Sequence, residues 1–369
     1  MSIPRLSAHC CAALLSVMIL APSAVGDRAN KSNPQKFTIE WLRGKCDACG
    51  IPFSLGWFQF VTPTEGWAAG QYLSVKGNGS GRSTILHTSD GGHTWKQLPR
   101  VEKQGAEYPP PFWFVDSKHG WVSWMGDEAV DHLESTEDGG VTWKSLEGPP
   151  LGVIATLRFF DAAKGISIIS KLNARPEFCS TNDSGRTWTN KDLPIKSYFG
   201  QPYFLNPEIG WLIGIALKEG SDGNLGVLKT VDHGASWTWS PLPVFQSASQ
   251  VEWDWIDQAN GWLILLLDDW TVARLLRTRD GGSSWEKQRD ESFQGEGKYM
   301  PAIRFVTKNV GYAFCDDTQS GRHFLLSTRD GGETWQRSPL KKGVSSCQSV
   351  GPELWCTSGM DLLKIRTLD

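Results

Sequence analysis

The sequence predicts an all-β fold, a seven-bladed β-propeller of four-stranded antiparallel blades, and three observations lead to it. An octet of the form T-x-D-x-G-x-T/S-W recurs six times along the chain. Successive copies lie 48, 45, 49, 48 and 50 residues apart, a period typical of repeat architectures. No segment keeps the 3.6-residue apolar period of an amphipathic helix, which excludes helical repeats. The octets end at Trp95, Trp143, Trp188, Trp237, Trp285 and Trp335.

Composition agrees with a globular repeat protein. Of the 369 residues, 40% are hydrophobic and 21% are charged, a balance that fits neither a disordered chain nor a bundle of membrane helices. The formal net charge of −3 gives no footprint for a polyanion, so nucleic acid is excluded as the main partner. The 19 Trp are an unusual number, and the repeat accounts for eleven of them. A binding role is therefore sought among the other eight.

The N-terminus resembles a secretory signal. One early cation, Arg5, precedes an apolar run over 10–21 and the small residues of 24–26. We expect a signal peptide over 1–26, a short linker over 27–36 and the propeller over 37–369. The protein is then exported, to the periplasm or beyond, or to a lumen in a photosynthetic organism. The alternative is an uncleaved N-terminal anchor.

A second element precedes each octet tryptophan by about 28 residues. It is an apolar strand, a short polar turn and then Gly-Trp or a relative, as in FQFVTPTEGW and YFLNPEIGW. Together with the strands before and after the octet, it gives four antiparallel strands per repeat, which is one propeller blade.

The octet itself is interpreted as structural. Its Asp carboxylate can accept backbone N–H bonds in a turn, and the Gly two residues later can take a positive φ. The tryptophan covers the base of the hairpin. A catalytic or calcium role is disfavoured because the aspartates are spread one per blade. They are Asp90, Asp138, Asp183, Asp232, Asp280 and Asp330.

The blade count follows from length. The 369 residues less the 26 of the signal, divided by 48, give just over seven blades, although only six octets exist. The segments 344–350, 353–357 and 362–367 read as three further strands, and 37–42 is the candidate for the fourth. Pairing the two ends would close the ring and remove open sheet edges. Six or eight blades are the alternatives.

The cysteines fit this closure. Cys347 and Cys356 would lie on neighbouring strands of the last blade, close enough for a disulfide. Cys46 and Cys49 are the other disulfide candidates, either with each other or across to the last blade. Cys179 and Cys315 fall in non-adjacent blades and are expected to be buried thiols.

The inner strand of each blade carries the candidate binding site. Six positions before the Gly of Gly-Trp, every blade has an aromatic wedge: Phe60, Phe114, Phe159, Phe204, Trp255 and Phe305. One residue earlier, on the opposite side of the strand, are the residues expected to face the central channel. Such a ring could bind a ligand or peptide, or merely line a water-filled tunnel. The ring consists of Gln59, Trp113, Arg158, Tyr203, Asp254 and Arg304.

Two other clusters are weaker candidates. Asp127, Glu128, Asp131 and His132 could ligate a metal but have no recognised spacing, so a solvated loop is favoured. Trp253, Trp255, Asp268, Asp269 and Trp270 could form an aromatic and acidic platform. No G-x-S-x-G, H-E-x-x-H or P-loop is present. We expect no enzyme, no cofactor and no metal.

The octet resembles the Asp-box (BNR repeat) of sialidase-type propellers. Combined with the export signal, the Gly-Trp strand and the 48-residue period, it resembles the photosystem II assembly and stability factor family, the Ycf48/Hcf136-like propellers, from Phe37 to Asp369. The resemblance implies a non-enzymatic factor that binds partner proteins during assembly. We expect a monomer that binds a partner protein or peptide on the face with the long loops or at the channel mouth, with a membrane protein complex as a possible client. Family members bind through a basic patch, but the arginines here are scattered.

Two other classes remain as alternatives to the assembly factor. One is a carbohydrate-binding propeller, favoured by the surplus tryptophans. The other is a sialidase-like glycosidase, which would need an arginine triad, an F/Y-R-I-P segment and a Tyr–Glu pair. No F/Y-R-I-P segment occurs in the chain, and the ring offers no Glu in register with Tyr203.

Overall fold

The protein is described by a computed structural model covering residues 37–46, 53–72, 82–99, 103–104, 111–125, 131–149, 153–170, 174–216, 225–243, 248–267, 273–289, 302–317 and 320–367. The described residues all belong to the second of the chain's two units, Gln35–Asp369. The predicted signal peptide and linker lie outside the described residues. Within the described ranges, no helix has the length and hydropathy needed to cross a membrane.

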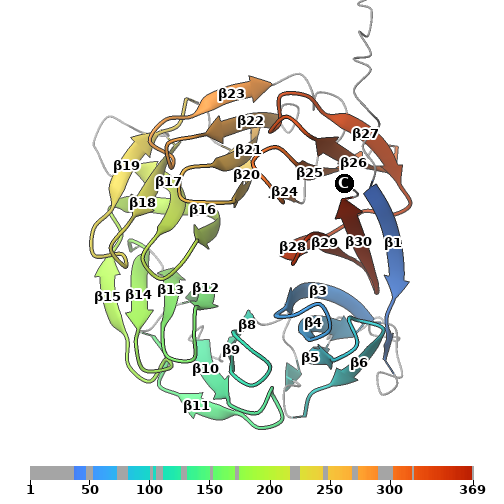
Figure 1. The fold of residues 1–369 in the computed structure, drawn as a ribbon. Coiled ribbons are helices and arrows are strands. Elements are labelled where there is room, and N and C mark those ends of the chain that lie inside the picture. Colours follow the sequence, from blue (N-terminus) through green and yellow to red (C-terminus); the bar gives the residue numbers. More distant parts are fainter. Residues whose placement is uncertain are drawn as a thin grey trace, which may run out of the picture. The chain divides into compact units, whose positions relative to one another are not determined.

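The second unit contains seven antiparallel blades arranged around a central axis (Figure 1), as the sequence predicts. Each blade has four strands, and the first also carries two short extra ones, β2 and β7. The strands, blade by blade, are β3 Phe53–Phe60, β4 Gly66–Tyr72, β5 Arg82–Thr88 and β6 Thr94–Gln97, with β2 Lys45–Cys46 and β7 Lys103–Gln104; β8 Phe112–Phe114, β9 Gly120–Met125, β10 Asp131–Thr136 and β11 Lys144–Leu146; β12 Val153–Phe159, β13 Gly165–Ser170, β14 Glu177–Thr181 and β15 Thr189–Asp192; β16 Ile195–Phe204, β17 Gly210–Ala216, β18 Leu225–Thr230 and β19 Thr238–Pro241; β20 Ala248–Trp255, β21 Gly261–Leu267, β22 Ala273–Thr278 and β23 Glu286–Arg289; β24 Ile303–Phe305, β25 Gly311–Asp317, β26 Arg322–Thr328 and β27 Gln336–Leu340; β28 Ser346–Val350, β29 Glu353–Ser358, β30 Asp361–Thr367 and β1 Phe37–Arg43.

The seventh blade is built from both ends of the described chain. Strand β1 pairs antiparallel with β30 over seven residue pairs, from Phe37↔Thr367 to Arg43↔Asp361. The chain then reaches the outer edge of blade 1, where β2 pairs parallel with β6. The N-terminal segment therefore joins blade 7 to blade 1, and the predicted closure of the ring is confirmed.

One disulfide reinforces the closing blade. Cys347 and Cys356 are directly opposed on β28 and β29 and are bonded, as predicted. Cys179 and Cys315 are buried thiols in blades 3 and 6. Cys46 is disulfide-bonded, but Cys49 lies outside the described residues, so the pairing of these two stays a prediction.

The Gly-Trp pair explains how neighbouring blades fit together. The glycine lies under the aromatic wedge of its own blade: a Cβ on Gly66 would come within 2.5 Å of the Phe60 ring. The tryptophan stacks on the wedge of the next blade, as Trp67 does on Phe114 with ring centroids 3.8 Å apart. Both residue types are thus needed because rings from two blades share this narrow space.

In the Asp-box hairpins, the Asp carboxylates accept hydrogen bonds from residues of their own turn. In the first one, Thr94 donates to both carboxylate oxygens of Asp90, from its backbone N–H at 2.9 Å and its hydroxyl at 2.6 Å. The Thr88 hydroxyl also donates to this carboxylate and accepts from Gly92 N–H. The same bonds hold Asp138, whose pKa falls to about 2 because the hydroxyl and the N–H of Thr142 stabilise its charge. These carboxylates are occupied within their own turns.

Candidate functional site: the central channel

The predicted ring residues all lie on the innermost strand of a blade. These strands, β3, β8, β12, β16, β20 and β24, surround the central axis in Figure 1. The structure divides the ring residues into two groups. The side chains of one group are hydrogen-bonded to the backbone of the next blade. The side chains of the other group make no such bond in the described residues.

Gln59 belongs to the bonded group. Its amide donates to the carbonyl of Phe114 at 2.7 Å and accepts from the N–H of the same residue at 2.8 Å. A seventh member of the ring, Gln348, makes the same pair of bonds to Phe60, both at 2.9 Å. Gln348 was not predicted from the sequence, because the ring positions were counted back from the Gly-Trp pair of each repeat and blade 7 has no such pair. Both glutamines hold one blade to the next.

Tyr203 and Asp254 play a similar part on the other side of the ring. The Tyr203 hydroxyl donates to the carbonyl of Trp255 at 2.7 Å, and Asp254 accepts from Phe305 N–H at 2.6 Å. Burial raises the pKa of Asp254 to about 6, although Arg304 and backbone N–H groups oppose this shift. Burial and the charge of Asp254 raise the pKa of Tyr203 to about 12. Arg304 donates to the carbonyls of Cys347 and Ile303.

Arg158 differs from all of these. Its guanidinium carbon lies 5.1 Å from the ring centroid of Trp113, 5.5 Å from Phe160 and 5.8 Å from Tyr203. Its Nε is buried and has no hydrogen-bond partner among the described residues. Burial lowers the pKa of the guanidinium, and Tyr203 partly offsets this shift. A guanidinium held by three aromatic rings, with no anionic partner among the described residues, can donate charge-assisted hydrogen bonds to an acidic group of a ligand.

Trp57 is a second residue that sequence reasoning missed. It lies two residues before Gln59 on β3, and its side chain is 43% exposed. It lies at a β-bulge between Leu55 and Phe58, where the strict alternation of side chains is interrupted, so the sequence pattern does not fix the face that it occupies. Trp57, Trp113 and Arg158 come from the inner strands of three consecutive blades.

The two weaker clusters gain no support. Trp253 and Trp255 are buried in the core, and Trp253 donates its indole N–H to the Gln201 carbonyl. Asp268, Asp269 and Trp270 lie outside the described residues, as do Asp127 and Glu128. Asp131 and His132 begin strand β10 and so do not lie in a loop, and His132 is exposed. Within the described ranges, no three His, Cys, Asp or Glu side chains are grouped so as to hold a metal ion.

The fold and site thus define a closed seven-bladed propeller in which an arginine on one inner strand lies among aromatic rings and has no anionic partner in the described residues. No family model matches the chain. A curated relative, the photosystem II assembly lipoprotein Ycf48 of Synechococcus sp. (strain CC9902), is 24% identical over 227 residues, which are 60% of this chain. The chain spans 58% of the length of that relative.

Solved structures share the fold over most of the chain. YCF48 bound to D1 peptide superimposes with a TM-score of 0.61 at 16% identity, covering 89% of this chain and 97% of that one. YCF48 from Cyanidioschyzon merolae gives 0.60 at 17% identity, covering 88% and 98%. An inactive virginiamycin B lyase from Staphylococcus aureus, in complex with quinupristin, gives 0.56 at 12% identity, covering 90% and 100%. The resemblance to the Ycf48/Hcf136-like propellers is confirmed in sequence and fold, and enzymes share the architecture.

Proposed function

We propose that this chain is an exported, non-enzymatic propeller that binds a partner protein and assists the assembly or stability of a protein complex. The likeness to Ycf48, one of whose structures holds a D1 peptide, supports the assembly role. The observation that carries the site is Arg158, a guanidinium among three aromatic rings with no acidic partner in the described residues. A membrane protein complex is the kind of client that the resemblance favours.

The partner segment is acidic. A carboxylate that reaches Arg158 replaces the water lost on burial with charge-assisted hydrogen bonds, each worth about 1.5–3 kcal/mol. Trp57 and Trp113 provide apolar area for the residues beside that carboxylate. Gln59 and Gln348 are not part of this surface, because their amides already bind neighbouring backbone.

The test is a titration of a D1 peptide, with capture of partners from the exported fraction as a second readout. We expect Arg158→Ala to weaken binding tenfold or more, as loss of a charge-assisted bond requires. Arg175→Ala is the matched control, because Arg175 is an exposed arginine on the same blade. It should change the affinity less than twofold. Equal affinities of wild type and a folded Arg158→Ala variant would refute the site.

A carbohydrate-binding propeller is the second candidate, and the exposed indole of Trp57 is the observation that favours it. Aromatic faces can stack on sugars as well as on peptides. Quenching of tryptophan fluorescence by neutral oligosaccharides, lost in Trp57→Ala but kept in Arg158→Ala, would support this candidate over the first. Hydrolysis of a fluorogenic sialoside by the pure protein would overturn the non-enzymatic assignment.

A further inference from the structure

The inner strand of blade 4, β16, departs from a regular ladder more than any other described inner strand. Its register against β17 shifts twice, between Ile195 and Ser197 and again between Phe199 and Tyr203, whereas β3, β12 and β20 each shift once. The second shift places residues 200–202 opposite Leu212 alone, which is a bulge. Bulges interrupt the ladder and are over-represented next to active sites, where they re-aim a side chain.

The backbone of this bulge is fixed by its neighbours. Gly200 has a φ of 65°, and a Cβ at this position would lie 3.0 Å from the Val251 carbonyl oxygen in blade 5, so a glycine is needed. Pro202 has no N–H and therefore needs no ladder partner. The indole N–H of Trp253 donates to the Gln201 carbonyl at 2.7 Å. The side chain of Gln201 takes no part in these contacts.

The Gln201 side chain reaches the face of β12 that carries Arg158. The Thr156 hydroxyl donates to Gln201 Oε1 at 3.2 Å, in an exposed contact. Thr156 and Arg158 are two residues apart in an uninterrupted stretch of register, so their side chains share one face of β12. Tyr203 meets the same face at Arg158. Gln201 itself is exposed, and no described residue accepts a hydrogen bond from its amide N–H groups.

The two contacts between β12 and β16 lie at different depths in the propeller. Strand β12 leads into the turn 160–164, where the Ala163 carbonyl accepts from Ser184 N–H in the Asp-box hairpin of the same blade at 2.8 Å. Arg158 is nearer to this turn than Thr156 is. The amide of Gln201 therefore lies between Arg158 and the opposite face, which carries the long loops.

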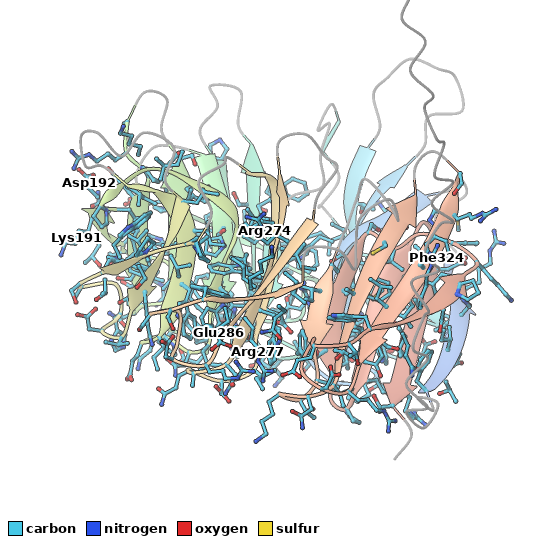
Figure 2. All side chains as sticks on the ribbon, turned by 90° about the horizontal axis from the view of Figure 1, so that it is seen from above. Lys191, Asp192, Arg274, Arg277, Glu286 and Phe324 are labelled. Atoms are coloured by element: carbon cyan, nitrogen blue, oxygen red, sulfur yellow. A yellow bond between two sulfur atoms is a disulfide. The ribbon has the colours of Figure 1, made fainter. Side chains whose placement is uncertain are left out.

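The Asp-box face is the lower one in Figure 2. Arg277 donates to the Gly331 carbonyl of an Asp-box hairpin at 3.4 Å, and it lies lower in this view than Arg274 of the same strand, β22. A ligand that enters from the upper face reaches Gln201 before it reaches Arg158.

The separation of the two contacts indicates the kind of ligand. Two residues of a strand span about 6–7 Å. The Arg158 guanidinium extends away from Gln201, because it contacts Phe160 near the Asp-box end. A single carboxylate cannot bridge this distance. In an extended peptide, however, backbone carbonyls recur along the chain, so one of them can face the Gln201 amide while a carboxylate is at Arg158.

We propose that Gln201 donates an amide N–H to a backbone carbonyl of the partner peptide while Arg158 binds a carboxylate of the same peptide. The inference rests on the proposed function and adds the form of the ligand. The ligand is an extended segment that lies along β12 and β16 with its acidic residue toward the Asp-box end. Thr156 is a positioning residue, because its hydroxyl holds the amide oxygen and leaves the amide N–H groups for the ligand.

The test compares the affinities of a D1 peptide and of the same peptide with its acidic groups converted to amides. Gln201→Leu removes the donor and should weaken binding of both peptides about fivefold, as loss of one neutral hydrogen bond requires. Arg158→Met should weaken binding of the acidic form alone. Gln258→Leu is the matched control, because Gln258 is exposed in a turn of blade 5. It should leave both affinities within twofold of wild type.

A second variant and a second readout guard against a merely structural effect. Gln201→Glu keeps the shape of the side chain and adds a negative charge, so it should weaken binding of the acidic form more than binding of the amidated form. In nitrogen-15 NMR spectra, the side-chain amide resonance that is absent from Gln201→Leu should shift when wild type is titrated with either peptide.

The outcomes separate this inference from the proposed function. Unchanged affinities in a folded Gln201→Leu variant, with a loss in Arg158→Met, would overturn the inference alone. A Gln201→Leu loss confined to the acidic form would also overturn it, because the amide would then bind the carboxylate. A loss in Gln201→Leu without one in Arg158→Met would refute the Arg158 site and keep the Gln201 contact. No binding of either peptide to wild type would overturn both.

Discussion

Gln348 in blade 7 and Arg158 in blade 3 hold the same register position on the inner strands but end in opposite situations. Gln348 lies opposite Trp355 and binds both backbone groups of Phe60 in the next blade. Arg158 lies opposite Ile166 and binds no backbone group in the described residues, resting instead on Trp113, Phe160 and Tyr203. The same register position therefore serves two purposes. In blade 7 its side chain stabilises the closure of the ring, and in blade 3 its side chain remains able to bind a partner.

The largest effect is expected from Gln348→Ala. The change leaves the N–H and carbonyl of Phe60 without partners at the closing junction. With about 1–2 kcal/mol for each lost bond, the free energy of unfolding should fall by about 3 kcal/mol. Urea denaturation of the variant measures this, with an exposed glutamine such as Gln258→Ala as the control. A decrease in the free energy of unfolding below about 0.5 kcal/mol, a rough limit for surface substitutions, would mean that Gln348 does not stabilise the closing junction.

Removing the disulfide of the same blade should cost slightly less. Cys347 and Cys356 are separated by 9 residues in sequence, and the chain-entropy relation gives about 2–3 kcal/mol for so short a loop. The Cys347→Ser/Cys356→Ser variant should therefore unfold at lower urea concentration than wild type. Reduction of wild type should lower the midpoint at least as far, because it also opens the disulfide of Cys46, and an unchanged midpoint of the double variant would contradict the prediction.

Asp254 should impose a pH dependence of about 2–3 kcal/mol. Its pKa is about 6 in the folded protein against 3.8 for an ordinary aspartate, and one pKa unit is about 1.4 kcal/mol. The folded state holds the proton more tightly, so stability is highest below pH 3.8 as far as this group is concerned and falls as the pH rises to 6. Asp254→Asn should remove the fall between pH 4 and 6.

The Asp-box aspartates act in a lower pH window, which separates the two effects. Their pKa values are lowered, to about 2 for Asp90, Asp138 and Asp183. Their contribution to stability is present above pH 4 and is lost as the pH falls toward 2. Asp254→Asn should leave this acid limb unchanged, whereas Asp138→Asn should reduce it.

The smallest effect on stability is expected from Arg158→Met. Methionine keeps the packing against the three rings and removes a desolvated cation, so the free energy of unfolding should stay level or rise by up to about 1 kcal/mol. Thermal unfolding beside the Gln348→Ala variant measures the contrast. A loss of stability as large as that of Gln348→Ala would mean that Arg158 has a structural role like that of Gln348.

Sequence reasoning predicted the parts of the molecule that repeat locally. The Asp-box turns, the aromatic wedges and the Cys347–Cys356 bridge depend on neighbouring residues or on one register, which the 48-residue period reveals. The partners of Gln59 and Tyr203 were not predictable, because their bonds reach the backbone of the next blade.

The most direct measurement is a double-mutant cycle between Arg158 and the carboxylate of the bound peptide. A D1 peptide and the same peptide with its acidic groups converted to amides are titrated into wild type and Arg158→Met. The account predicts that amidation weakens binding to wild type at least tenfold and leaves binding to Arg158→Met unchanged, which is a coupling energy of about 1.4 kcal/mol or more. Equal losses on amidation in both proteins would contradict it.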